Sequence, residues 1–113
     1  MENLFDNTNV VFFEENDFDI NGNLQQKSSD PVFIGILSTS CPWCHRAAPE
    51  LAKLSKSKDI IVGVLVDSLT GSKLLNKVGA RGVPTFLLFE NGELTSVYEG
   101  NRDAASFKKF ILG

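Results

Sequence analysis

The stretch Cys41-Pro42-Trp43-Cys44 decides the fold of this chain of 113 residues. Cysteine followed by proline suits the start of a helix, because proline fits the first helical position, where its missing N–H is not needed. Cys44 then lies three residues along the same helical face, with the two β-carbons about 5–6 Å apart. A disulfide needs Cα atoms roughly 4.4–6.8 Å apart. The spacing therefore predicts a disulfide that forms and opens with little backbone movement.

The two cysteines are expected to have different roles. Unpaired backbone N–H groups and the positive end of the helix dipole stabilise a thiolate on Cys41. Cys44 is one turn inside the helix and is expected to be less exposed. We therefore predict that Cys41 is the nucleophile that attacks a substrate disulfide, and that Cys44 resolves the resulting mixed disulfide.

Two other interpretations of the cysteine pair have less support from the residues. A zinc site needs about four ligands, and the chain offers only Cys41, Cys44 and His45 as soft candidates. The string from Cys41 to His45 also fits the attachment pattern of c-type haem. The chain has no second histidine, however, and its only methionine is Met1. We predict that it holds no metal and no other cofactor.

The rest of the chain predicts an α/β fold. The near-continuous apolar runs at 32–37 and 60–66 have strand length and suit strands covered on both faces. Asn91-Gly92 is a favoured two-residue hairpin turn. Further strands are predicted at 10–13, 85–89 and 94–98, and helices at 42–56, at 72–78 closed by Gly79, and after a cap at Asp103. This order implies a central mixed sheet of about five strands with helices on both faces.

Two segments carry weaker signals. Within residues 14–30, Phe18 and Ile20 alternate with Asp19, and the following Asn21-Gly22 favours a small hairpin or an irregular turn as much as a helix. Residues 1–9 are polar and rich in asparagine, which predicts a loose N-terminal lead-in. The length suits one domain over residues 1–113.

Composition restricts the classes of partner. The net charge is −3 and no run of Lys and Arg occurs, so we do not expect nucleic-acid binding. The apolar run at 60–66 is far shorter than a membrane span. No basic segment followed by an apolar one begins the chain, so no signal peptide is visible and a reducing, cytoplasmic setting is expected.

Two stretches together resemble the thioredoxin superfamily. Residues 40–49 resemble its redox helix, including Pro49 five positions after the second cysteine, and residues 78–85 resemble its cis-proline loop. The resemblance implies a thioredoxin fold and a cis bond before Pro84. It also implies that the backbone of Val83 faces the cysteines, where an extended substrate segment can pair with it. Trp43 is expected to form an apolar wall of this substrate groove.

Residues 98–102 look most like the catalytic domains of protein disulfide isomerase. That resemblance adds Gly100 to the substrate groove, and it implies that Arg102 lowers the pKa of the second cysteine. The chain departs from the family at Gly35, where thioredoxins and protein disulfide isomerases have a buried acid that accepts the proton of that cysteine. Ser40 replaces the usual tryptophan. His45 is then a candidate proton shuttle, with a plain solvent-facing role as the alternative.

The resemblance implies a thiol–disulfide oxidoreductase that acts on protein thiols and disulfides. A reductase or glutathione would recycle it, and a monomer is expected. The sequence Cys-Pro-aromatic-Cys is closer to glutaredoxin, so a glutathione-dependent enzyme is one alternative, although residues 90–93 lack the Gly-Gly segment that binds glutathione there. A redox-inert binding or chaperone module is the other. The motif does not fix the reduction potential, so reductase, oxidase and isomerase stay open.

Overall fold

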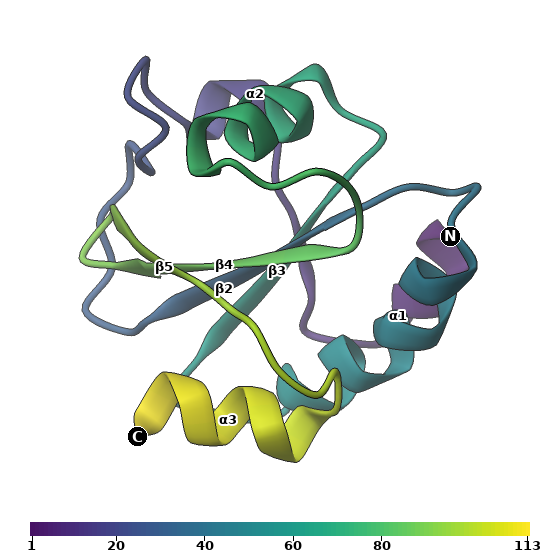
Figure 1. Ribbon diagram of the computed structural model, residues 1–113. Helices are drawn as coiled ribbons and strands as arrows, with labels where there is room; N and C mark the ends of the chain where they lie inside the picture. The colour runs from purple at the N-terminus through teal and green to yellow at the C-terminus, as the bar shows by residue number, and fades with distance from the viewer.

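The computed structural model describes the backbone of residues 1–113 and every side chain except that of Glu2. A five-stranded mixed sheet with the strand order β1-β3-β2-β4-β5 forms its centre (Figure 1). The central strand β2 runs parallel to β3 and antiparallel to β4. The strands are β1 (Val11–Phe12), β2 (Val32–Leu37), β3 (Ile61–Val66), β4 (Thr85–Glu90) and β5 (Glu93–Val97), and the helices are α1 (Pro42–Leu54), α2 (Leu69–Val78) and α3 (Ala104–Leu112). The predicted fold class is confirmed.

Helices cover both faces of the sheet. Figure 1 shows α2 on one side and α1 with α3 on the other. Every residue of β2 is buried, because alternate side chains enter two separate apolar clusters. Phe33 belongs to the cluster beneath α1 and α3, and Ile34 belongs to the cluster beneath α2. This double burial explains the continuous apolar run in the sequence of β2.

Four aromatic rings join α3 to the sheet beside the end of β5. Phe107 is fully buried, and its ring centroid lies 4.9 Å from that of Phe86 and 5.1 Å from those of Phe33 and Tyr98. Edge-to-face and tilted pairs at these distances stabilise a core beyond their area burial. The Tyr98 hydroxyl also donates to the carbonyl of Asn101. The cluster thereby fixes the loop between β5 and α3.

The predicted turns and caps lie where the sequence places them. Asn91 and Gly92 both have positive φ, 53° and 83°, as a two-residue turn of type I′ requires. Gly79 ends α2 with φ at 73° in the left-handed region. Asp103 caps α3 by accepting a hydrogen bond from the backbone N–H of Ser106. The segment 14–30 contains an antiparallel bridge between Phe18 and Leu24, so of the alternatives that the sequence leaves open the structure has the small hairpin around Asn21-Gly22.

The prediction of a loose lead-in over residues 1–9 is wrong. Glu2–Phe5 forms a short 3-10 helix, and the side chain of Phe5 is only 4% exposed. Phe5 joins the apolar cluster under α1, and Figure 1 shows this segment beside that helix. One aromatic side chain that finds a hydrophobic site is enough to order a segment that is otherwise polar.

Several predicted boundaries also shift. The helix expected at 72–78 begins earlier, at Leu69, because Ser68 is its N-cap and accepts hydrogen bonds from the N–H groups of Thr70 and Gly71. The helix expected to reach residue 56 ends at Leu54. The first strand is limited to Val11–Phe12. A second 3-10 helix, Glu15–Asp17, was not predicted.

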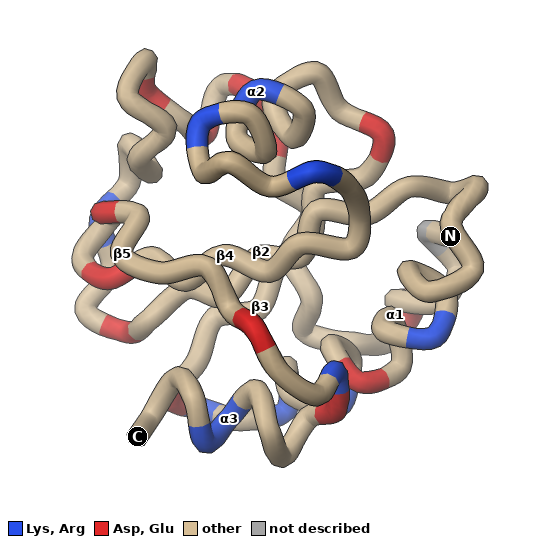
Figure 2. The backbone as a smooth tube through the Cα atoms, in the orientation of Figure 1, with Lys and Arg blue, Asp and Glu red and all other residues tan. Residues whose placement is uncertain are grey.

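Figure 2 shows Lys and Arg positions dispersed over helices and loops, with acidic positions between them.

Among the residues that the structure describes, no helix combines the length and the apolar character that a membrane span requires.

Candidate active site

Cys41 and Cys44 meet at the first turn of α1. Cys41 is the N-cap, in an extended conformation, and Pro42 occupies the first helical position. The backbone N–H of Cys44 donates a hydrogen bond of 3.1 Å to the sulfur of Cys41. Both cysteines are free thiols. The helix start therefore presents a backbone donor to the Cys41 sulfur, where such a donor stabilises a developing thiolate.

The loop before β4 brings the backbone of Val83 to the same sulfur. The thiol of Cys41 donates to the Val83 carbonyl at a Sγ–O distance of 3.7 Å, although the two residues are 42 positions apart in the chain. The Val83–Pro84 peptide bond is cis, as the sequence resemblance implies. Cys41 is half-buried, so a substrate sulfur can reach it from the solvent side.

Cys44 occupies a different environment. It is fully buried in the cluster beneath α1 and α3. Burial raises the pKa of Cys44 to about 12, and its side-chain hydrogen bond with Cys41 acts in the same direction. A hydrogen bond from the backbone of Ser38 and the positive charge of Arg102 lower this pKa. The second thiol is therefore kept neutral by its surroundings, and only these two groups favour its ionisation.

Gly35 stands where the family resemblance leads one to expect an acid, and the space beside it is filled. A Cβ on Gly35 would lie 3.0 Å from the Cδ1 methyl of Leu51 and 3.5 Å from the ring of Phe86. Both neighbours are buried. Hydrocarbon therefore fills the place where the family resemblance leads one to expect a carboxylate.

Arg102, Gly100 and Pro84 line one groove of about 380 Å³, whose lining residues include neither cysteine. Gly100 has φ at 151°, and a Cβ there would lie 2.8 Å from the hydroxyl oxygen of Tyr98. Glycine is therefore required at this position by the close approach of the tyrosine. The structure brings together three of the residues that the resemblance assigns to substrate binding and to the control of Cys44.

Trp43 and His45 lie on the exposed surface around the pair. The side chain of Trp43 is 57% exposed, and the guanidinium carbon of Arg46 lies 4.7 Å from its ring centroid. The Nε2 of His45 lies 2.9 Å from the carbonyl oxygen of Thr39. This bond directs the imidazole to the loop before Cys41, and the hydrogen bonds of the described residues include none from His45 to a sulfur.

Sequence reasoning missed Asp67, Thr39 and Arg46. Asp67 follows β3 directly. Thr39 lies just beyond the end of β2, the strand that pairs in parallel with β3. The carboxyl ends of parallel strands meet at one edge of a sheet, where ligands commonly bind in such folds. An acid immediately after a buried strand was therefore a usable signal. Arg46 had a weaker one, three residues after Trp43 on the same helix.

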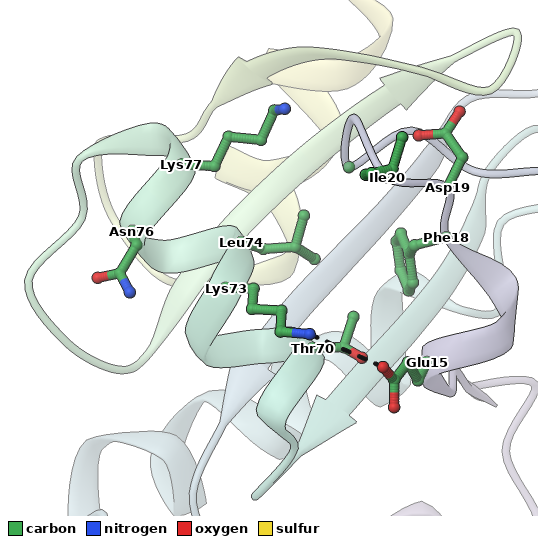
Figure 3. A pocket seen from close by; sticks show the side chains of 10 residues that line it. Glu15, Phe18, Asp19, Ile20, Thr70, Lys73, Leu74, Asn76 and Lys77 are labelled. Carbon is green, nitrogen blue, oxygen red and sulfur yellow. Dashed lines mark ion pairs between the residues drawn. The ribbon is translucent and has the colours of Figure 1, made fainter.

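A further cavity of about 580 Å³ lies on the α2 side of the sheet. Figure 3 shows Phe18 and Leu74 facing its interior, with Lys73 and Glu15 joined across it by an ion pair of 3.9 Å. None of the residues that line it is a cysteine. Within the described part of the chain, no three His, Cys, Asp or Glu side chains are grouped so that they could hold a metal ion.

Sequence comparisons with known proteins identify the family of the chain. A family model described as thioredoxin matches residues 9–112. The chain is 37% identical over 86 residues to thioredoxin Y2, chloroplastic, of Arabidopsis thaliana, and 36% identical over 77 residues to protein disulfide-isomerase 5-1 of the same plant. These alignments cover 75% and 63% of the chain, and 50% and 53% of the relatives, so the chain spans about half the length of each.

Solved structures agree on the fold. The J-Trx1 fragment of ERdj5 superposes with a TM-score of 0.74 at 23% identity, over 96% of this chain and 53% of that one. Thioredoxin f from spinach chloroplast, in its short form, superposes with a TM-score of 0.69 at 21% identity, over 92% and 91% of the two chains.

Proposed function

The chain belongs to the thioredoxin family, and we propose that its Cys41/Cys44 pair exchanges disulfides with protein substrates. One observation carries this proposal: the half-buried sulfur of Cys41, at a helix N-cap, accepts a hydrogen bond from the backbone N–H of Cys44, and the Cys44 side chain itself is fully buried one turn away. An exposed nucleophile and a buried resolving thiol are the two parts that thiol–disulfide exchange needs.

The reaction proceeds in two displacements. The thiolate of Cys41 attacks one sulfur of the substrate disulfide, forms a mixed disulfide with it and releases the other substrate sulfur as a thiolate, which takes up a proton. Cys44 then loses its proton, and its thiolate attacks the Cys41 sulfur. The mixed disulfide breaks, the second substrate thiol leaves, and the chain holds a Cys41–Cys44 disulfide. Two electrons pass from the dithiol to the substrate, and the reverse sequence oxidises a substrate dithiol.

An extended polypeptide is the substrate shape that suits the groove. The Val83 carbonyl lies within 3.7 Å of the attacking sulfur, and an added strand could use this backbone for pairing. The groove with Pro84, Gly100 and Arg102 lies on one side, and the exposed indole of Trp43 offers an apolar contact. We assign these residues to substrate binding, and Arg102 also to the ionisation of Cys44.

We also propose a recycling partner, an oligomeric state and a compartment. A monomer that a dedicated reductase or glutathione keeps reduced would serve as a reductant, and a reducing compartment such as the cytoplasm suits that role. Reductase, oxidase and isomerase differ in the reduction potential of the pair. A potential near or below about −270 mV would favour a reductant, and one near about −120 mV an oxidant.

Turnover of insulin disulfides tests the proposal. The reduced chain should cleave them catalytically when thioredoxin reductase and NADPH regenerate its dithiol, and the Cys41→Ser variant should not. Turnover that occurs only with glutathione and glutathione reductase would favour the glutaredoxin-like alternative instead. No cleavage by the fully reduced chain, even at equimolar amounts, would leave a redox-inert binding module and would reject the proposal.

A further inference from the structure

The segment 38–40, which leads into Cys41, is bound to the end of β3 through Asp67. Asp67 has φ at 49°, in the left-handed region, and its backbone N–H donates to the Leu37 carbonyl at 3.0 Å. This conformation directs its carboxylate to Thr39. The Thr39 hydroxyl donates to Oδ2 of Asp67 at 2.8 Å, and the backbone N–H of Thr39 lies 3.3 Å from both carboxylate oxygens.

A second contact holds Thr39 at its backbone carbonyl. The Nε2 of His45, in the first turn of α1, bonds the Thr39 carbonyl at 2.9 Å. The backbone N–H, the carbonyl and the hydroxyl of Thr39 are thus all engaged. Asp67 directly follows β3 and His45 lies in α1, so the two contacts tie Thr39 to the end of β3 and to the first turn of α1.

Thr39 lies within the turn that delivers the nucleophile. The backbone N–H of Cys41 donates to the Ser38 carbonyl at 3.2 Å, and the hydroxyls of Ser38 and Ser40 lie 3.1 Å apart. All three side chains of this segment are small and polar, so apolar packing contributes little to fixing it. Hydrogen bonds from Thr39 and then Ser38 hold the pKa of the Asp67 carboxyl below its usual range, as expected of an ionised acceptor.

We propose that Asp67 and His45 are positioning residues that hold Thr39, and through it the sulfur of Cys41, in the orientation from which it attacks a substrate disulfide. This inference rests on the proposed function. Neither residue touches the reacting sulfurs. Their effect is exerted through the 38–40 segment, which in this chain carries serine where the family has a tryptophan. Misplacing a reacting group by about 1 Å can cost up to about 10²-fold in rate. Contacts that fix the turn before Cys41 therefore affect the rate of the first displacement.

Matched pairs of variants separate the positioning effect of these contacts from their effect on the stability of the fold. Thr39→Val removes the hydroxyl and keeps the shape of the side chain, while Thr39→Ser retains the hydroxyl. Asp67→Gly removes the carboxylate without backbone strain, because glycine accepts positive φ, and Asp67→Asn retains an oxygen acceptor. His45→Ala removes the donor, and His45→Gln restores an N–H group at a similar reach.

The readout is the single-turnover rate at which reduced protein attacks 4,4′-dithiodipyridine, a neutral disulfide, together with the free energy of unfolding in urea. Thr39→Val, Asp67→Gly and His45→Ala should each slow the first displacement by about 3- to 10-fold, and the conservative partner of each should recover most of the rate. Because Thr39 and Asp67 act through one contact, the double variant Thr39→Val/Asp67→Gly should be no slower than the worse single variant.

Wild-type rates in Thr39→Val, Asp67→Gly and His45→Ala would overturn the proposal that Asp67 and His45 position Thr39. So would losses that the conservative partners do not recover, or losses that simply follow the fraction of unfolded protein. Each of these results leaves the exchange reaction itself intact. If the wild-type chain does not react with the disulfide at all, the proposed function fails instead, so the two failures are distinguishable.

Discussion

The Cδ1 methyl of Leu51 lies 3.0 Å from the point that a Cβ on Gly35 would occupy. Leu51 is fully buried, and this contact closes the space in which the family resemblance would place an acidic side chain. Cys44 must therefore ionise next to hydrocarbon, with help only from the backbone of Ser38 and the charge of Arg102. The second thiol therefore lacks the acid that the family resemblance leads one to expect beside it.

Adding a side chain at Gly35 should destabilise the fold. Gly35→Ala forces the Leu51 methyl to move, whereas the ring of Phe86 at 3.5 Å is in ordinary contact. Overpacking of this kind costs about 1–3 kcal/mol of unfolding free energy. Gly35→Asp should cost more, because it also buries a carboxyl without a partner. Urea unfolding of the reduced variants measures both losses. A Gly35→Asp variant of wild-type stability that resolves mixed disulfides faster would show that space for the acid exists after all.

The rate of the resolving step should rise steeply with pH. Since burial raises the pKa of Cys44 to about 12, the thiol is neutral near pH 7, and its thiolate fraction grows about tenfold per pH unit below that pKa. Stopped-flow absorbance with 4,4′-dithiodipyridine resolves two releases of thiopyridone, the second of which is the attack of Cys44. We expect this second phase to accelerate about tenfold per unit between pH 7 and 9. A second phase that is flat over that range would contradict a neutral, buried Cys44.

Arg102 should affect the second phase and leave the first nearly unchanged. Its positive charge lowers the pKa of Cys44, so Arg102→Gln should slow resolution by about 3- to 10-fold, since one pKa unit corresponds to a tenfold change in thiolate. The matched control Arg102→Lys keeps the charge and should retain most of the rate. The same reagent and the same two phases provide the measurement. Equal second-phase rates in the Gln and wild-type proteins would remove Arg102 from the ionisation of Cys44.

Phe107 should be among the most costly residues to truncate. It is fully buried against three other aromatic rings, and Phe→Ala changes in such sites typically cost about 3–5 kcal/mol. Phe107→Leu should cost clearly less, because it fills more of the cavity. Urea unfolding of the two variants gives both values. A loss below about 1 kcal/mol for the alanine variant would mean that the aromatic cluster does not anchor α3.

Local signals made most of the fold predictable. The apolar run that forms β2, the Asn91-Gly92 turn and the Asp103 cap each depend on a few adjacent residues, and the structure has them where they were expected. The redox pair was predictable for the same reason, because its spacing alone places both sulfurs on one helical turn.

Features that depend on distant contacts escaped prediction. Phe5 is buried only because α1 and the sheet offer it a site, which its polar neighbours do not reveal. The contact of Asp67 with Thr39 joins residues 28 positions apart and needs β2 and β3 to be adjacent and parallel. The sequence marks His45 as a candidate proton shuttle, yet its position is defined by a backbone carbonyl that no spacing rule indicates.

The division of roles between the two sulfurs is the central claim, and one trapping measurement tests it most directly. Cys44→Ser and Cys41→Ser variants are incubated with a disulfide-bonded protein, and mixed disulfides are mapped by peptide mass spectrometry. Cys44→Ser should accumulate a stable adduct through Cys41, because the resolving thiol is absent, and Cys41→Ser should accumulate almost none, because Cys44 is buried and neutral. Adducts through Cys44 in the Cys41→Ser variant, formed as readily as those through Cys41, would contradict the account.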